Sequence, residues 1–152
     1  MCSLNGDVFM IELNEKNGAA LVEFVLVLFI LVGLMCAVIE VTMYFKDCAT
    51  ATMCARDGAR DLAFGRTSTA AMHRVLGCDS TGLLTSSNVS FTYSTALTGV
   101  WSALPADFST QNGVSAGYFV SCSVRKPHTW VTGLFKPIFP ATANAQLIMV
   151  RD

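Results

Sequence analysis

One apolar run constrains this chain more than any other feature. Residues 19–39 carry a single charge, that of Glu23, and the run ends at Glu40. As an α-helix, the run would be about 32 Å long at about 1.5 Å per residue, which is enough to cross a bilayer. An ionised carboxylate inside such a segment costs on the order of 3 kcal/mol. The sequence therefore predicts a membrane-spanning helix in which Glu23 either meets a compensating charge or reaches the nearby headgroups.

Two kinds of cleaved export signal do not fit this run. A signal peptide has a shorter apolar core followed by small residues, whereas this run continues into MCAVIEVTMYF. A lipoprotein signal needs small residues before its cysteine, but Leu34 and Met35 precede Cys36. We therefore expect a span that is either uncleaved or cut on its N-terminal side.

Length and charge narrow the class further. With 152 residues the chain is too short for two ordinary domains, and its 53% hydrophobic content reflects the apolar run. Ten basic and eleven acidic residues leave a net charge of −1, so we expect no nucleic-acid partner.

The basic residues around the span bear on its orientation. Only Lys16 precedes the span closely, while Lys46, Arg56 and Arg60 follow it. The positive-inside rule alone would therefore place the C-terminal part in the cytoplasm.

A helical period continues beyond the span. One stripe of mostly small apolar residues predicts a single helix over residues 19–64, with Gly65 as its stop: Tyr44, Cys48, Ala51, Ala55, Ala59 and Leu62. Gly58 interrupts this helix at a cost of about 1 kcal/mol unless something packs closely against it. A second, shorter helix is expected to follow. Its N-cap would be Thr67 or Ser68, and it would end at Gly77.

Three later stretches alternate apolar and polar residues, as strands do. Their apolar faces are Val89, Phe91 and Tyr93 in the first stretch, Tyr118, Val120, Cys122 and Val124 in the second, and Ala145, Leu147 and Met149 in the third. Long loops are expected at residues 95–115 and 125–142. The fold class predicted is α+β, with a long N-terminal helix packed on a small antiparallel β-sheet.

Four cysteines follow the apolar run: Cys48, Cys54, Cys78 and Cys122. On one helix, Cys48 and Cys54 would be about 9 Å apart along the axis, beyond the limit of about 7 Å for a disulfide. Either of them could pair with Cys78 or Cys122. The simplest bridge joins Cys78 to Cys122, and the alternative is four buried free thiols. No metal site is expected, because His73 and His128 stand alone.

Other possible functional residues have ordinary explanations. Ser123 and Lys126 have the spacing of an SxxK acylase motif, but they fall at the end of a predicted strand rather than at a helix start. The charged residues of the exposed helix either form a solvated face, which is the expectation, or contact another subunit: Asp47, Asp57, Arg60 and Asp61. The aromatic residues of the second loop either pack over the helix or form an apolar patch: Trp130, Phe135 and Phe139.

Four stretches of the sequence are informative together: GAALVEFVLVL, IEVTMYF, CARDGARDLA and the closing ATANAQLIMVRD. They resemble the TadE-like minor pilins (pseudopilins) of the tight adherence, or Flp, pilus system, a kind of type IV pilus. The resemblance covers the first 65 residues well and the last strand loosely. It implies a pilin-like fold with a prepilin-type leader at residues 1–18, a transmembrane segment at 19–40 and an α+β head at 41–152.

The resemblance also implies roles for particular residues. A prepilin peptidase would cut after Gly18, so that Ala19 becomes the new N-terminus and Glu23 the fifth residue of the mature chain. The new ammonium group of Ala19 and the Glu23 carboxylate, one helical turn apart, would then neutralise each other within one subunit or between neighbours. Glu40 matches a second acidic position, at the far end of the span.

A structural role is therefore expected, with no enzyme activity and no cofactor. The resemblance implies a minor pilin that initiates the assembly of a tight adherence pilus or lies at its tip. Such a pilus would serve adhesion or secretion. Its partners would be other pilins, the prepilin peptidase, the inner-membrane assembly platform and membrane lipid, with the head in the periplasm. The alternative is an uncleaved single-span membrane protein with a small extracytoplasmic binding domain.

Overall fold

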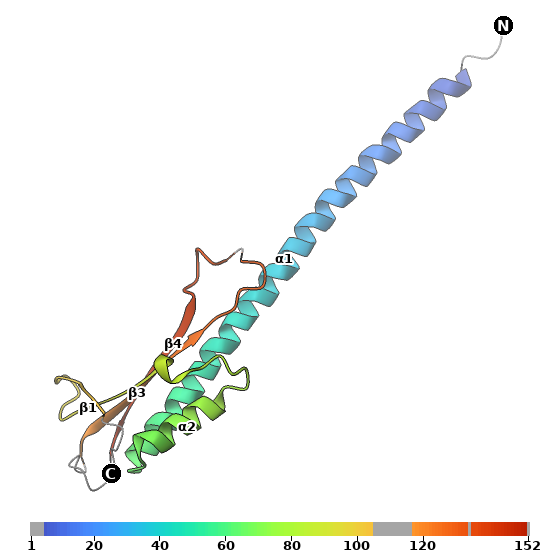
Figure 1. Ribbon diagram of the computed structural model, residues 1–152. Coiled ribbons are helices and arrows are strands. Elements are labelled where there is room, and N and C mark those ends of the chain that lie inside the picture. The colour runs from blue at the N-terminus through green and yellow to red at the C-terminus, as the bar shows by residue number, and fades with distance from the viewer. Residues whose placement is uncertain (1–4, 105–116, 134, 152) are drawn as a thin grey trace. The chain divides into compact units, whose positions relative to one another are not determined.

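The computed structural model describes residues 5–104, 117–133 and 135–151, and their side chains from Gly18 onward (Figure 1). Cys2 and much of the first predicted loop lie outside the described residues. The chain divides into two compact units, residues 1–40 and 41–152. The first unit is helical, and the second contains a helical hairpin and a β-sheet.

The first helix, α1, runs from Asn5 to Ala63. It begins well before residue 19, where the sequence analysis placed its start, because residues 5–18 lack proline and include several strong helix formers. Its predicted stop is confirmed. Gly65 has φ +75°, and its N–H donates to the Leu62 carbonyl at 3.0 Å, while the N–H of Arg66 donates to the Asp61 carbonyl at 3.0 Å. These two bonds form a Schellman motif, which satisfies the last helical carbonyls.

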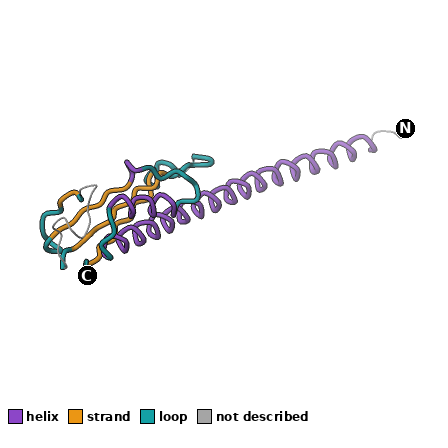
Figure 2. Tube along the Cα trace, turned by 60° about the horizontal axis from the view of Figure 1, so that its bottom comes forward, coloured by secondary structure: helices purple, strands orange, loops and turns teal. Residues whose placement is uncertain are grey.

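The second helix, α2, spans Ser68–Cys78 and returns alongside α1 (Figures 1 and 2). Thr67 is its N-cap, as predicted, and its side chain accepts a hydrogen bond of 3.2 Å from the N–H of Ala70. Gly77 does not end the helix, contrary to expectation. The helix continues to Cys78, and Asp79 takes the C-cap position in an extended conformation.

The sheet contains four antiparallel strands in the order β2-β1-β3-β4. The strands are β1 (Val89–Ser94), β2 (Ser102–Ala103), β3 (Phe119–Pro127) and β4 (Thr142–Val150), and a 3₁₀ turn, η1 (Ser86–Asn88), precedes β1. Three strands were expected. β2 was missed because a strand of two residues is too short to show an alternation of apolar and polar residues. β3 also extends three residues into the second predicted loop, to Pro127.

The core lies between one face of this sheet and the two helices that cover it (Figure 2). The stripe expected on α1 is confirmed: its four members from Ala51 to Leu62 are at most 1% exposed. The apolar faces expected of the strands are confirmed too, since Val120, Cys122 and Val124 are fully buried and the outward positions of β4 are exposed. The predicted α+β architecture, a long helix packed on a small antiparallel sheet, is the one observed.

Candidate functional site

The first candidate site is the apolar part of α1. The helical stretch Gly18–Ala63 contains a window with a mean hydropathy of 3.0, none of which is buried. Large side chains are exposed all along it, for example Phe24 at 66%, Phe29 at 77% and Ile30 at 68%. By length and composition this helix can cross a membrane.

The proposed processing residues lie at the start of this apolar stretch. Gly18, Ala19 and Glu23 are all exposed, and no atom outside the helix backbone lies within 4 Å of a Cβ placed on Gly18. Ala19 and Glu23 are four residues apart on one helix, so they lie on the same face, one turn from each other. No ion pair joins Glu23 to any side chain that the structure describes.

Glu40, the second acidic position, differs from Glu23 in its surroundings. It is 1% exposed, although it follows directly after the apolar run. A carboxylate at such a depth is costly unless polar groups compensate it. The two acidic positions that the sequence placed at either end of the span therefore occupy opposite environments, one exposed and one buried.

A second candidate site is an ion network inside the head, centred on Lys126. Its Nζ lies 2.7 Å from Oδ1 of Asp79 and 3.1 Å from Oδ1 of Asp47, and its side chain is 1% exposed. Asp47 also faces His128, with 2.6 Å between Oδ2 and Nδ1. The network thus connects α1, the end of α2 and β3. Sequence reasoning assigned Asp47 to a solvated face, and this prediction is wrong, because the side chain is 14% exposed and pairs with Lys126. The contact of His128 with Asp47 was not foreseen.

Asp79 has the most complete set of partners in this network. Its carboxylate accepts hydrogen bonds from the backbone N–H groups of Thr81, Leu83 and Leu84 at 3.0–3.2 Å, and from the Thr81 hydroxyl at 2.7 Å. Burial alone would raise the pKa of Asp79, but the bonds from Lys126 and Thr81 outweigh it and hold the pKa well below its usual range. For Lys126, burial lowers the pKa, but the two carboxylates outweigh it and raise the pKa above 10.5.

A cluster of rings covers the His128 end of the network. Tyr44 of α1 stacks on Trp130 with 6.2 Å between ring centroids and 10° between planes, and it lies 5.1 Å from Phe139. His128 meets Trp130 edge to face at 4.5 Å. Of the two interpretations of the loop aromatics, packing over the helix is confirmed for Trp130 and Phe139.

The ARDGAR segment, residues 55–60, lies where the two helices and the sheet meet. A Cβ placed on Gly58 would be 2.6 Å from Cγ2 of Val75 and 2.8 Å from Sγ of Cys122, so only glycine fits. The close packing that would justify a mid-helix glycine is therefore present. Asp61, predicted to be solvated, is buried and pairs with Arg74 at 2.7 Å between Oδ2 and Nε.

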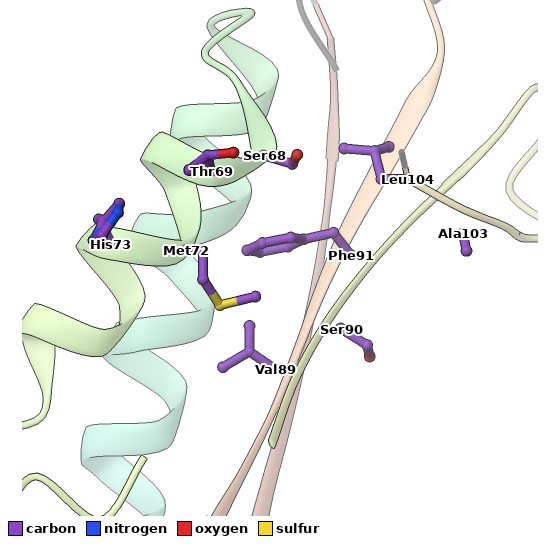
Figure 3. Close-up of a pocket in the computed structure, with 9 residues that line it drawn as sticks. All are labelled: Ser68, Thr69, Met72, His73, Val89, Ser90, Phe91, Ala103 and Leu104. Carbon is purple, nitrogen blue, oxygen red and sulfur yellow. The ribbon is translucent and has the colours of Figure 1, made fainter. Parts of the chain in front are cut away.

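The third feature is an apolar groove of about 440 Å³ between α2 and β1. Figure 3 shows the ring of Phe91 extending from the strand toward α2, next to Met72. Leu104 closes another side of the groove, and Ser68 and Thr69 border it at the start of α2. Sequence reasoning did not find this groove, because it depends on how α2 meets the sheet.

The cysteines are free thiols throughout the described part of the chain. Burial and, after it, the neighbouring Cys78 thiol raise the pKa of the Cys54 thiol to about 12. Cys122 faces Gly58 instead, and burial raises its pKa to about 12. The predicted Cys78–Cys122 bridge is not formed here, and these contacts place Cys78 beside a different partner. Among the described residues, no three His, Cys, Asp or Glu side chains group as a metal site requires.

One signal in the sequence could have revealed Lys126. It occupies the same face of β3 as Val120, Cys122 and Val124, two positions beyond the last of them. Alternation therefore aims it into the core, where a lysine needs a carboxylate. No comparable local signal identifies Asp79, which lies 47 positions earlier in the chain.

An exposed apolar helix long enough to span a membrane, together with a small α+β head, is a pilin-like arrangement. Residues 18–60 match the family model described as TadE-like protein. The resemblance to that family is thereby confirmed for residues 18–60, from Gly18 to the end of ARDGAR. Neither the curated proteins nor the solved structures contain a match to the chain.

Proposed function

We propose that the protein is a minor pilin of a tight adherence pilus, cut by a prepilin peptidase after Gly18 and then assembled through its apolar helix. The observation that carries this proposal is the family match, which begins at Gly18 and includes Ala19 and Glu23 at the start of an exposed apolar helix. The head at residues 41–152 favours a low-copy initiating or tip subunit over the repeating subunit of a shaft. We place the head in the periplasm and the apolar helix in the inner membrane.

Cleavage at Gly18 gives Glu23 a natural partner. It would create an ammonium group on Ala19, one helical turn before the Glu23 carboxylate. Each charge alone is costly in hydrocarbon, and together they largely cancel. Between subunits the same pairing would set the axial register, because a misplaced subunit would leave both charges unpaired in lipid.

The surface of the apolar helix supports a role in assembly. Its large side chains are exposed on every side, so lipid or neighbouring helices of the same kind can cover them. The other partners in this proposal are the prepilin peptidase, which reads the start of the helix, and the inner-membrane assembly platform. Adhesion or secretion is then a property of the assembled pilus rather than of this subunit.

The head supports a structural role rather than an enzymatic one. Ser123 and Lys126 are three residues apart on β3, so their side chains point to opposite faces of the sheet. Lys126 is also held by two carboxylates and is fully buried. The SxxK spacing therefore provides no nucleophile and base in contact.

The test is N-terminal sequencing of the mature protein from membranes, with Gly18→Ala as the cleavage variant and Gly33→Ala as the matched control. Gly33 lies in the same apolar helix, and a Cβ there meets nothing within 4 Å. We expect a chain that starts at Ala19 in the wild type and the control, and an uncut chain in Gly18→Ala. An intact leader in the wild type would contradict the proposal.

A second candidate function is an uncleaved single-span membrane protein with a small extracytoplasmic binding domain. The groove of about 440 Å³ between α2 and β1 is the observation that favours it. This function requires neither cleavage nor assembly, so N-terminal sequencing distinguishes the two candidates directly.

A further inference from the structure

The two helices of the head have a fixed antiparallel register. Asp61 of α1 pairs with Arg74 of α2 at 2.7 Å. Gly58 lies nearer the middle of α1 than Asp61. A Cβ placed on Gly58 would be 2.6 Å from the side chain of Val75. As the residue number falls along α1, the facing residue number therefore rises along α2.

Extending this register by one turn brings two cysteines together. Cys54 lies four residues before Gly58 on α1, and Cys78 lies three residues after Val75 on α2. Both steps follow the same direction in space and keep each residue on the contacting face. The Cys78 thiol is also near enough to Cys54 to raise its pKa, in addition to the larger effect of burial. We infer that Cys54 and Cys78 form a disulfide that joins the two helices of the head.

The helix contact provides the short distance that such a bridge needs. Gly58 lets α1 approach α2 closely, because a Cβ there would be 2.6 Å from Cγ2 of Val75, and both residues are buried. Closely packed helix axes are about 8 Å apart, and each Cα lies about 2.3 Å from its own axis. Facing Cα atoms then fall within the limit of about 7 Å for a disulfide.

The other cysteines of the head face elsewhere. Cys122 is fully buried in the sheet, and its Sγ lies against Gly58. Cys48 lies beside Tyr44, one turn earlier on the same helix, and burial and Cys48 together raise the pKa of Tyr44. Cys78 therefore has Cys54 as its neighbour, whereas Cys122 and Cys48 contact residues that cannot form a disulfide.

The oxidation needs a disulfide oxidant, such as oxidised glutathione or the disulfide of an oxidoreductase. Cys78 is half-buried and Cys54 is 0% exposed, so the oxidant meets Cys78 first. The Cys78 thiolate attacks the oxidant and forms a mixed disulfide, releasing one thiol. The Cys54 thiolate then attacks Sγ of Cys78 and releases the second thiol. Two S–H bonds are lost, one S–S bond forms, and the two electrons reduce the oxidant's disulfide to two thiols, which take up the protons.

In the cell, this bridge depends on one part of the proposed function, namely that the head faces an oxidising compartment. The experiment therefore uses the purified full chain in detergent with oxidised glutathione, so that its result does not depend on cleavage or orientation. After alkylation of the remaining thiols, digestion on the amino side of aspartate separates the cysteines of interest. The fragments are residues 47–56 with Cys48 and Cys54, residues 61–78 with Cys78, and residues 107–151 with Cys122.

We expect residues 47–56 to be linked to residues 61–78, with the loss of two hydrogens in the mass of the protein. The same link should persist in Cys48→Ser and in Cys122→Ala, which remove the competing thiols. A link from residues 61–78 to residues 107–151, its loss in Cys48→Ser, or full alkylation of Cys54 and Cys78 would each overturn the inference. N-terminal sequencing of the same preparation reports separately on the proposed function.

Discussion

Lys126 donates a hydrogen bond from Nζ to Oδ1 of Asp79 at 2.7 Å, and the two side chains are 1% and 0% exposed. The pair joins β3 to the end of α2 across 47 positions of the sequence. Asp47 of α1 lies 3.1 Å from the same Nζ. One buried lysine thus connects all three parts of the head, and its removal would leave carboxylates in the core without their cation.

Replacement of Lys126 by methionine is therefore expected to destabilise the head by about 3–5 kcal/mol, because the buried Asp79 and the half-buried Asp47 lose their counter-charge. Urea unfolding of the reduced full chain in detergent, followed by tryptophan fluorescence, measures the change. Lys46→Met is the matched control, since Lys46 is exposed, and it should change stability by less than about 0.5 kcal/mol. Equal effects of the two variants would contradict the role given to the network.

The stability of the head should also depend on pH through Asp79. The pKa of Asp79 is held below its usual range in the folded head, so the folded state binds fewer protons than the unfolded chain there. The stabilisation is fully present above the ordinary aspartate pKa of about 3.9, and it is lost as the pH falls from there toward the folded pKa. Urea midpoints measured from pH 6 downward should fall in this acid range.

Asp79→Asn provides the control for that pH dependence. The amide does not titrate, so this variant should be less stable at pH 6 and should lose less stability on acidification than the wild type. Parallel acid profiles for the two proteins would show that other groups cause the loss. On the alkaline side, the raised pKa of Lys126 predicts stability that is present below about 10.5 and lost as the pH rises through the folded pKa.

Two glycine-to-alanine substitutions in the head helices should have opposite effects. Gly58→Ala places a Cβ 2.6 Å from Val75 and 2.8 Å from Cys122, both fully buried, so we expect a loss of about 1–3 kcal/mol. Gly77→Ala meets nothing within 4 Å and should gain about 0.5–1 kcal/mol from helix propensity. Denaturant midpoints of the two variants measure the difference, and a stabilising Gly58→Ala would refute the close approach.

Glu23→Gln tests the proposed charge pair independently of processing. Cleavage after Gly18 should proceed, but the ammonium of Ala19 would have no counter-charge, so incorporation into pili should fall by roughly tenfold or more. Glu23→Asp keeps the charge and should retain much of the incorporation. The measurement is the amount of mature protein in sheared pili relative to membranes. Normal incorporation of Glu23→Gln would remove the electrostatic argument.

The sequence by itself determined the elements whose signals are local. The helical period from Tyr44 to Leu62 predicted the face of α1 that is buried in the head, and Thr67 and Gly65 marked one helix start and one helix end correctly. Alternation predicted the inward faces of three strands. Such patterns are visible without the fold because each depends only on the repeat of one element and the dihedral angles that its end residues prefer.

The tertiary structure alone decided which distant residues meet. Asp47 and Asp61 look solvated in the sequence, yet Asp61 is buried beside Arg74 and Asp47 is half-buried beside Lys126. The neighbour of Cys78 is likewise Cys54 rather than Cys122, because Gly58 and Val75 set the helix register. Charges and thiols carry no periodic signal that names a partner, so their pairing follows from the docking of helix on helix and helix on sheet.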